Sequence, residues 1–433
     1  MDRQEGRSRH AVLQPRPCRT TKRVRPGLEP LVERPDRSSK REDLAASDVE
    51  PRSRHVGSAS SMVCHADATL DCSRSLPYLV RLASSGAAMS PGGDRMGTIR
   101  RRAAALSATA LIVTGIVGAG SAAAATPLPA HVFAPYFETW TTDGITATAQ
   151  ASTVKYFTLA FLETTSKTSC TLAWDGVASQ PVTGGKYLSD IGSLLALGGD
   201  VIPSLGCWSA DQGGTEIGDS CKTVSSIEAA YEQLVNTYGI SRIDMDIEGR
   251  SLTKTDGIDR RNKAIALLNQ RMPGVQISYT LPTSRTGLEA NGLAVLQNAL
   301  TNGVRIDFVN PMVFDYYDRQ VKPMGQSAID ALNGLHAQLT QLLTGKTSAQ
   351  IWAIEGATIM NGLDDYPKKT ESTSLADAQQ ILNFANANGM SNLSMWAIQR
   401  DNGGCPGNTG SNSCSGIVQN TWDFSHLLNP FTQ

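Results

Sequence analysis

After about position 127, apolar residues follow two alternating patterns. Eight short apolar runs, several rich in β-branched or aromatic residues, alternate with segments in which apolar residues return every three or four positions. The first pattern is typical of buried strands and the second of amphipathic helices. The runs are HVFAPYFETW, KYFTLAFL, VIPSLGCW, SRIDMDIEG, VQISYTLP, RIDFVNPMVFDYY, IWAIEGATI and NLSMWAIQR, which begin at positions 131, 155, 201, 241, 275, 305, 351 and 392.

The helical segments carry recognisable end signals. In the segment from Ser225 to Gly239, Ser225 and Glu228 have the spacing of a capping box, and the glycine stops the helix. The segment from Ser374 to Gly389 repeats the scheme. Helical periodicity also covers residues 292–303 and 328–343.

Eight strand–helix units predict an α/β fold, a (β/α)8 TIM barrel that forms a single domain over residues 127–433. The rival arrangement is an open, doubly wound sheet. It would need a glycine-rich phosphate-binding turn after an early strand, and the sequence has none there.

The first 125 residues have a different composition. Residues 1–95 hold 17 Lys and Arg, 12 Asp and Glu and little apolar periodicity, so we expect them to be disordered. Residues 96–125 run from Met96 through three arginines and an Ala-rich apolar stretch to small residues, which is typical of a secretory signal peptide. Because such a signal works at the amino terminus, we hypothesise that translation starts at Met96. The rival interpretation is a membrane anchor with a basic tail.

The rest of the chain is acidic and contains all six tryptophans. It holds 19 Lys and Arg against 28 Asp and Glu, which argues against nucleic acid as a partner. We expect a secreted, extracellular monomer with no stable membrane association after signal cleavage.

An exported chain can keep disulfides, and five cysteines follow position 125. The loop CPGNTGSNSC predicts a Cys405–Cys414 bond. Of the others, Cys207 ends an apolar run, so we favour Cys170–Cys221 between two polar loops. No Cys/His spacing typical of a zinc site is present in the sequence, and we expect no metal.

The run from position 241 stacks three carboxylates, Asp244, Asp246 and Glu248, at every second residue. In a strand these side chains share one face and the apolar residues between them share the other. Since apolar residues suit the surrounding helices, the acids should face the barrel interior. Glu248 comes last, at the carboxyl end where barrel active sites lie.

When carboxylates lie close together in a site with little water, their repulsion raises the pKa of at least one of them. The result is a protonated acid beside an ionised one, which is the pair that glycoside hydrolysis requires. Two plainer interpretations compete. One is a calcium loop, but its twelfth position, normally Glu, is Thr255. The other is a structural acid cluster neutralised by Lys or Arg.

The run IDMDIEG resembles the D-x-x-D-x-D-x-E signature of family 18 glycoside hydrolases, the chitinase-type barrels. PSLGC at 203–207 resembles the family's S-x-G-G, NPMVFDYY at 310–317 its M-x-Y-D region, and MWAIQRD at 395–401 its last strand. APYFETW and TIMNG fit the first and seventh strands. The motifs occur in the family's order along most of the chain after position 130.

The resemblance implies substrate-assisted catalysis, with Glu248 as general acid and later as base. The substrate's own 2-acetamido oxygen attacks the anomeric carbon, Asp246 stabilises the resulting oxazolinium, and Asp244 shares a proton with Asp246. It implies retention of configuration, no cofactor, and chitin or N-acetylglucosamine oligosaccharides as substrates.

The sequence departs from the family pattern at three positions. Ser241 stands for the first acid, Cys207 for the second glycine of S-x-G-G, and Phe314 for the tyrosine of M-x-Y-D, which orients the acetamide in the family. Tyr316 lies two residues on, hence on the same strand face, and we predict that it takes this role in preference to Tyr317.

Flat side chains suit the apolar faces of pyranose rings. The resemblance implies that Trp396 forms the base of the pocket for the reacting sugar and that Met312 lines this pocket. We predict that Trp140 and Trp208, at the ends of the first and third strands, extend the groove, and that Trp352 belongs to the core.

The leading functional hypothesis is a secreted, retaining endo-chitinase that hydrolyses β-1,4 links between N-acetylglucosamine units. An endo-β-N-acetylglucosaminidase acting on N-glycans would use the same acids and differ only in its loops. A catalytically inactive chitin-binding barrel is the third hypothesis, and Phe314 is the residue that motivates it.

Overall fold

The computed structural model describes residues 128–366 and 370–433, so the predicted disordered segment 1–95 and signal peptide 96–125 lie outside the described residues. The barrel is built from parallel strands, the first of which is split in two. The strands are β1 (Val132–Phe133) with β2 (Tyr136–Glu138), β3 (Tyr156–Thr164), β5 (Asp200–Gly206), β6 (Arg242–Asp246), β7 (Gln276–Ser284), β9 (Phe308–Met312), β10 (Gly356–Met360) and β13 (Asn392–Trp396).

The sheet closes on itself at the split first strand. Its order is β1-β13-β10-β9-β7-β6-β5-β3-β2. Strand β1 pairs with β13, and β2 pairs with β3, both in parallel. Because Ala134 and Pro135 alone separate β1 from β2, the two ends of the sheet belong to one extended segment. The Ala134 carbonyl accepts hydrogen bonds from the hydroxyls of Ser394 and Thr158, which join the two neighbouring strands across this seam.

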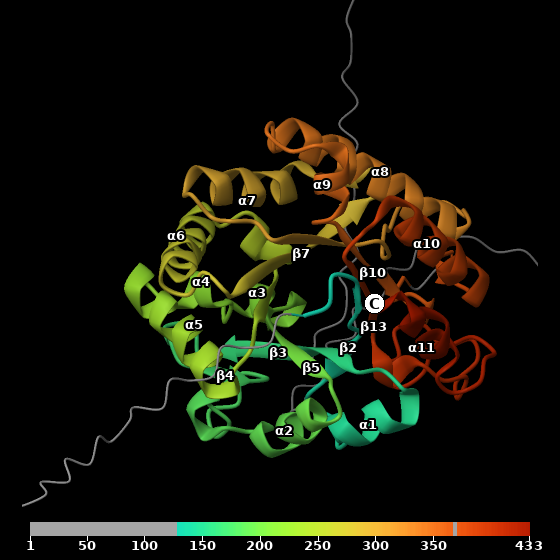
Figure 1. The fold of residues 1–433 in the computed structure, drawn as a ribbon, viewed down its shortest axis with the longest axis horizontal. Helices are drawn as coiled ribbons and strands as arrows, with labels where there is room; N and C mark the ends of the chain where they lie inside the picture. Colours follow the sequence, from blue (N-terminus) through green and yellow to red (C-terminus); the bar gives the residue numbers. More distant parts are fainter. Residues whose placement is uncertain (1–127, 367–369) are drawn as a thin grey trace, which may run out of the picture. The chain divides into compact units, whose positions relative to one another are not determined.

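Helices surround the strands (Figure 1). Those that follow the barrel strands are α1 (Ile145–Ser152), α2 (Leu188–Ala196), α5 (Val224–Tyr238), α6 (Thr255–Arg271), α7 (Ala290–Thr301), α8 (Met324–Leu342), α10 (Leu375–Asn388) and α11 (Asp423–Leu428). Shorter elements are α3 (Trp208–Gly213), α4 (Ile217–Ser220), α9 (Ser348–Trp352), β4 (Leu172–Trp174), β8 (Gly287–Leu288), β11 (Gly362–Leu363), β12 (Ser372–Thr373), η1 (Val182–Gly184), η2 (Gly249–Leu252), η3 (Ile398–Arg400) and η4 (Asn429–Phe431). The predicted (β/α)8 fold is confirmed.

The alternation in β6 separates an apolar face from an acidic one. Ile243, Met245 and Ile247 are buried in the main hydrophobic core. Asp244 and Asp246 alternate with them on the same strand and are also buried. The strand therefore gives its apolar face to the core and points its carboxylates the other way, toward the barrel interior.

The predicted ends of α10 are confirmed, and the predicted start of α5 is wrong. Ser374 and Asp377 form a reciprocal capping box, and Gly389 ends α10 in the left-handed conformation. Helix α5 instead begins after Thr223, whose hydroxyl accepts a hydrogen bond from the Ser226 N–H. Thr223, Ser225 and Ser226 all stand at the start of this helix, and sequence spacing alone could not tell which of them is the cap.

The seventh predicted strand begins too early. Trp352 and the residue before it end helix α9, and β10 starts at Gly356. A capping box formed by Thr347 and Gln350 starts this short helix. Trp352 is buried as predicted, but in a helix, where its ring stacks on that of His336 at 3.9 Å.

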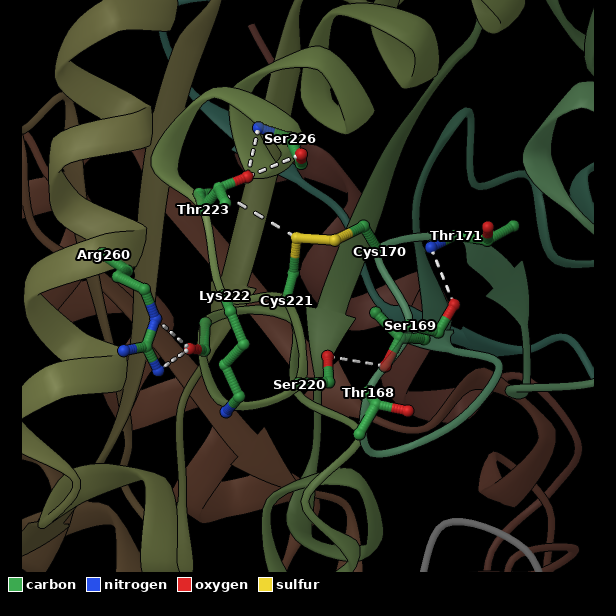
Figure 2. Close-up of a disulfide and its surroundings, with 12 residues drawn as sticks. Thr168, Ser169, Cys170, Thr171, Ser220, Cys221, Lys222, Thr223, Ser226 and Arg260 are labelled. Atoms are coloured by element: carbon green, nitrogen blue, oxygen red, sulfur yellow. Dashed lines mark hydrogen bonds between the residues drawn. A yellow bond between two sulfur atoms is a disulfide. The ribbon is translucent and has the colours of Figure 1, made fainter.

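Both predicted disulfides are confirmed, Cys170–Cys221 and Cys405–Cys414. Figure 2 shows the first one, which ties the loop before β4 to Cys221 at the end of α4, two residues before the cap residue Thr223. Among the described residues, no helix is long and apolar enough to cross a membrane.

Candidate active site

Asp244 is fixed in the barrel interior by three hydroxyl donors. It is buried, and both of its oxygens accept hydrogen bonds. Burial raises the pKa of Asp244, and these bonds oppose that effect because they stabilise the ionised carboxylate. The donors are Ser204 at 2.7 Å, Thr280 at 2.8 Å and Tyr136 at 3.0 Å.

Asp246 lies one step further along the same face and is less satisfied. It is 3% exposed, and its Oδ1 has no hydrogen-bond partner among the described residues. Burial, followed by the charges of Glu248 and Asp244, raises the pKa of Asp246 well above its usual value. This oxygen is therefore free to meet a ligand, and the carboxyl group holds a proton more readily than an exposed aspartate does.

Glu248 follows the end of β6 and is half-buried. Burial raises the pKa of Glu248 to about 7, and the charge of Asp365 acts in the same direction. A hydrogen bond from the Trp208 backbone N–H opposes the shift, since it favours the ionised form. Near neutral pH a large fraction of Glu248 is therefore protonated and able to donate its proton.

Helix α3 packs against the turn that contains Glu248 and Gly249. The fully buried Asp211 accepts a hydrogen bond from the Glu248 backbone N–H through its Oδ2. Gly249 lies so close to this helix that an added Cβ would be 3.0 Å from the Trp208 ring and 2.3 Å from the Gln212 amide nitrogen. Gly249 also has a φ of 43°, which strains residues with a side chain, so the turn after the acid favours glycine. Sequence reasoning missed Asp211, because it stands in a polar segment without periodicity.

An open pocket of about 610 Å³ of empty space lies over these acids. Asp246 and Glu248 line it on one side. Trp396 lines it as well and stacks on Phe161, with ring centroids 5.5 Å apart. Of the other predicted substrate-binding residues, Met312 and Trp208 line the pocket.

Trp140 lies beside this pocket rather than in its lining. Its ring packs against those of Trp396, at 6.2 Å, and Phe161, at 6.4 Å. It lines a second groove that adjoins the pocket.

Tyr316 does not line this pocket. It is absent from the lining, its ring lies 4.3 Å from the Arg285 guanidinium carbon, and its backbone N–H binds Glu371. Phe314 and Asp315 line the pocket instead. This position does not favour the predicted role of Tyr316 in orienting an acetamide.

Two further carboxyl groups border the pocket, Asp315 and Asp365. Burial and the neighbouring acid Asp364 raise the pKa of Asp315 well above its usual value. Asp365 gave no signal in the sequence, since it belongs to a polar loop after β11. Within the described part of the chain, no group of three or more His, Cys, Asp or Glu is arranged to hold a metal ion.

Comparison with known proteins assigns the family. Residues 132–404 match the model of glycosyl hydrolases family 18. The chain belongs to glycosyl hydrolase family 18. The family predicted from IDMDIEG is thereby confirmed.

Two curated relatives are similar over most of the described residues. The chain is 31% identical over 323 residues to a probable bifunctional chitinase/lysozyme of Escherichia coli (strain K12). This alignment covers 70% of this chain and 35% of that protein. The chain is also 32% identical over 288 residues to endochitinase 11 of Metarhizium anisopliae. That alignment covers 63% of this chain and 53% of the relative. The family 18 chain thus spans about a third and about half of the lengths of these relatives.

Among solved structures, the catalytic domain of a hyperthermophilic chitinase from Pyrococcus furiosus is similar to this family 18 chain. The two are 30% identical with a TM-score of 0.62, over 71% of this chain and 97% of that one. Catalytic-site mutants of active domain 2 of that chitinase, complexed with chito-oligosaccharides, match to the same degree.

Proposed function

We propose that this glycoside hydrolase is a retaining endo-chitinase that cleaves β-1,4 links between N-acetylglucosamine units. One observation carries the proposal. The buried Asp246, with an unpartnered oxygen, lies between the fully hydrogen-bonded Asp244 and a Glu248 whose pKa is raised to about 7. The relatives named as chitinases support the choice of substrate.

In the proposed reaction, the sugar to be cleaved stacks on Trp396, with its glycosidic oxygen at Glu248. Glu248 donates its proton to that oxygen, and the bond to the anomeric carbon breaks as the substrate's acetamido oxygen attacks from the opposite face. The electrons of the broken bond stay with the departing sugar. The product on the enzyme is a cationic oxazolinium.

Asp246 accepts the acetamide N–H through its free Oδ1 and stabilises the oxazolinium charge. Asp244, held by its three donors, keeps Asp246 in place. Glu248, now ionised, takes a proton from water while the water oxygen attacks the anomeric carbon. Two inversions at that carbon give overall retention.

We further propose that the mature protein is secreted and acts as a monomer outside the cell. The signal-like segment 96–125 supports the export of the chain. Amino-terminal sequencing of the native protein tests it. The expected first residue lies near Ala125, and a mature protein that retains residues before Met96 would contradict the proposal.

The test of the activity compares wild type, Glu248→Gln and the matched control Glu289→Gln, which changes an exposed glutamate at the start of α7. On chitin oligomers we expect Glu248→Gln to lose several powers of ten in kcat and the control to equal wild type. NMR of the fresh product should show the β-anomer. Equal turnover by wild type and Glu248→Gln would refute the proposal.

The same assay separates the alternatives when an N-glycoprotein is added as a second substrate. Release of glycans without turnover of chitin oligomers would identify an endo-β-N-acetylglucosaminidase. Binding of chitin oligomers without hydrolysis of either substrate would identify an inactive barrel.

A further inference from the structure

A serine, a histidine and a glutamate form a hydrogen-bonded chain outside the catalytic pocket. The imidazole of His336, on α8, contacts the Ser348 hydroxyl through Nε2 and the Glu355 carboxyl group through Nδ1, each at 2.8 Å. Ser348 is the first residue of α9, which lies beside α8 (Figure 1), and Glu355 directly precedes β10. We call these three residues the Ser348–His336–Glu355 triad.

The triad lies at the opposite end of the barrel from the catalytic pocket. Glu355 comes before the first residue of β10, whereas Met360, the last residue of that strand, lines the pocket. The five residues of β10 span about 15 Å. The triad therefore has no contact with a sugar held at Glu248, and its chemistry is separate from glycoside cleavage.

The exposure of the three side chains follows the order that nucleophilic catalysis requires. Ser348 is exposed, the His336 side chain is 16% exposed, and Glu355 is fully buried. The hydroxyl is thus open to a small molecule from solvent, while the acid is held inside the protein. A base within hydrogen-bond reach of a hydroxyl, and itself oriented by a third group, is the arrangement that activates a serine.

The His336 ring is held in place from a second side. It stacks on Trp352, with ring centroids 3.9 Å apart and planes 11° apart. Trp352 is buried at the end of α9, and the capping box of Thr347 and Gln350 fixes the start of the same helix. The hydroxyl of Ser348 and the ring that supports the imidazole therefore belong to one short helix, which keeps Nε2 aligned with the hydroxyl.

Burial sets the protonation of the two ionisable members. It raises the pKa of Glu355 to about 9 and lowers the pKa of His336. The other side chains in contact with this pair are uncharged. They are Ser348 and Trp352 from α9, and Ser391 before β13, whose hydroxyl donates to the Glu355 carbonyl at 3.5 Å. Near neutral pH the imidazole is therefore neutral, and Glu355 decides which of its nitrogens carries the proton.

The charge of Glu355 decides whether the imidazole acts as a base. While Glu355 is protonated it donates to Nδ1, so Nε2 carries the hydrogen and donates to Ser348. Once Glu355 is ionised it accepts a hydrogen bond from Nδ1–H, and Nε2 accepts one from the Ser348 hydroxyl. The ionised fraction of Glu355 rises about tenfold per pH unit up to its pKa, and the fraction of Ser348 with an available base rises with it.

We propose that Ser348 is the nucleophile of an acyl-transfer centre for esters of short carboxylic acids, with His336 as general base and Glu355 as the residue that orients it. The Ser348 oxygen attacks the ester carbonyl carbon and forms a C–O bond while its proton passes to Nε2. The bond to the alcohol oxygen breaks, the electron pair stays on that oxygen, and Nε2 returns the proton to it. Water, deprotonated by the same nitrogen, then releases the acid and restores Ser348.

The test measures acetylation by p-nitrophenyl acetate near pH 9 in wild type, Ser348→Ala and the control Ser225→Ala. Ser225 is also an exposed serine in the first turn of a helix, but within the described residues it forms no hydrogen bond with a histidine. We expect mass spectrometry to find the acetyl group on the Ser348 peptide in wild type and the control. Nitrophenol release should fall to the level of the lysine background in Ser348→Ala. Release that is equal in wild type and Ser348→Ala would overturn the proposal.

Two variants test the base and the acid separately. His336→Gln should lower the rate of acetylation at Ser348 about 100-fold or more. In Glu355→Gln the amide donates to Nδ1 at every pH, so the rise in rate between pH 7 and 9 should be lost. Thermal melts and turnover of chitin oligomers confirm folding, and the proposal is independent of the chitinase function. An unchanged rate in His336→Gln, or equal pH profiles in wild type and Glu355→Gln, would overturn it.

Discussion

The hydrogen bond from Glu248 to Asp211 predicts that a buried residue outside the pocket controls turnover. Asp211→Ala removes the acceptor of the Glu248 N–H. A buried donor left without a partner costs about 1–3 kcal/mol, and the turn can avoid that cost only by moving. A displacement of the acid on the order of 1 Å costs about 100-fold in rate. We therefore expect kcat to fall about 10- to 100-fold with KM changed less than about threefold.

Asp211→Asn is the matched control, because its amide oxygen can still accept the Glu248 N–H. We expect it to keep kcat within about threefold of wild type. Steady-state kinetics on a chitin oligomer, with thermal melts to confirm folding, measures both variants. Wild-type kcat in a folded Asp211→Ala variant would refute the positioning role. A loss in Asp211→Asn as large as in Asp211→Ala would show that the carboxyl group itself, rather than the accepted hydrogen bond, is needed.

Two further predictions concern groups at the edge of the pocket. Because burial raises the pKa of Glu248 to about 7, kcat should fall about tenfold per pH unit above that value as the acid loses its proton, and a flat profile up to pH 9 would contradict this. Tyr316→Phe should retain kcat within about threefold, since the ring over Arg285 remains and the hydroxyl lies outside the pocket lining; a large loss, measured on the same oligomers, would restore the role predicted from the sequence.

Periodicity along the strands carried most of the correct predictions. In β6 the alternation of Met245 with Asp244 and Asp246 dictated which face packs on the helices, and burial of the apolar face leaves the acids only the interior. Both ends of α10 were equally predictable, because the cap positions held by Ser374 and Gly389 have conformational requirements that few other residues meet.

The position of Tyr316 shows where periodicity stops. The prediction assumed that the alternation continues from Met312 to Tyr316. Strand β9 ends at Met312, and Asp315 and Tyr317 both have positive φ, at 51° and 53°. Residues that adopt left-handed backbone break the two-residue repeat, so Phe314 still lines the pocket while Tyr316 turns to Arg285. Asp365 was missed for the same reason, because a loop has no period from which to predict direction, and Asp211 was missed because the 6-residue helix α3 is too short to show one.

The charge balance of the pocket distinguishes a general acid from a structural acid cluster. Among the residues that the structure describes, four carboxyl groups line the pocket and no Lys or Arg does. Arg285 pairs with Asp318 at 2.7 Å and Arg261 with Glu216 at 3.1 Å, whereas the charge of the buried Arg400 acts on Asp365 and Asp315. Cations that paired with the pocket acids would hold their pKa values down and keep them ionised. At Asp246 and Glu248 burial instead raises the pKa, and the protonated carboxyl group of Glu248 is the state that proton donation to a leaving oxygen requires.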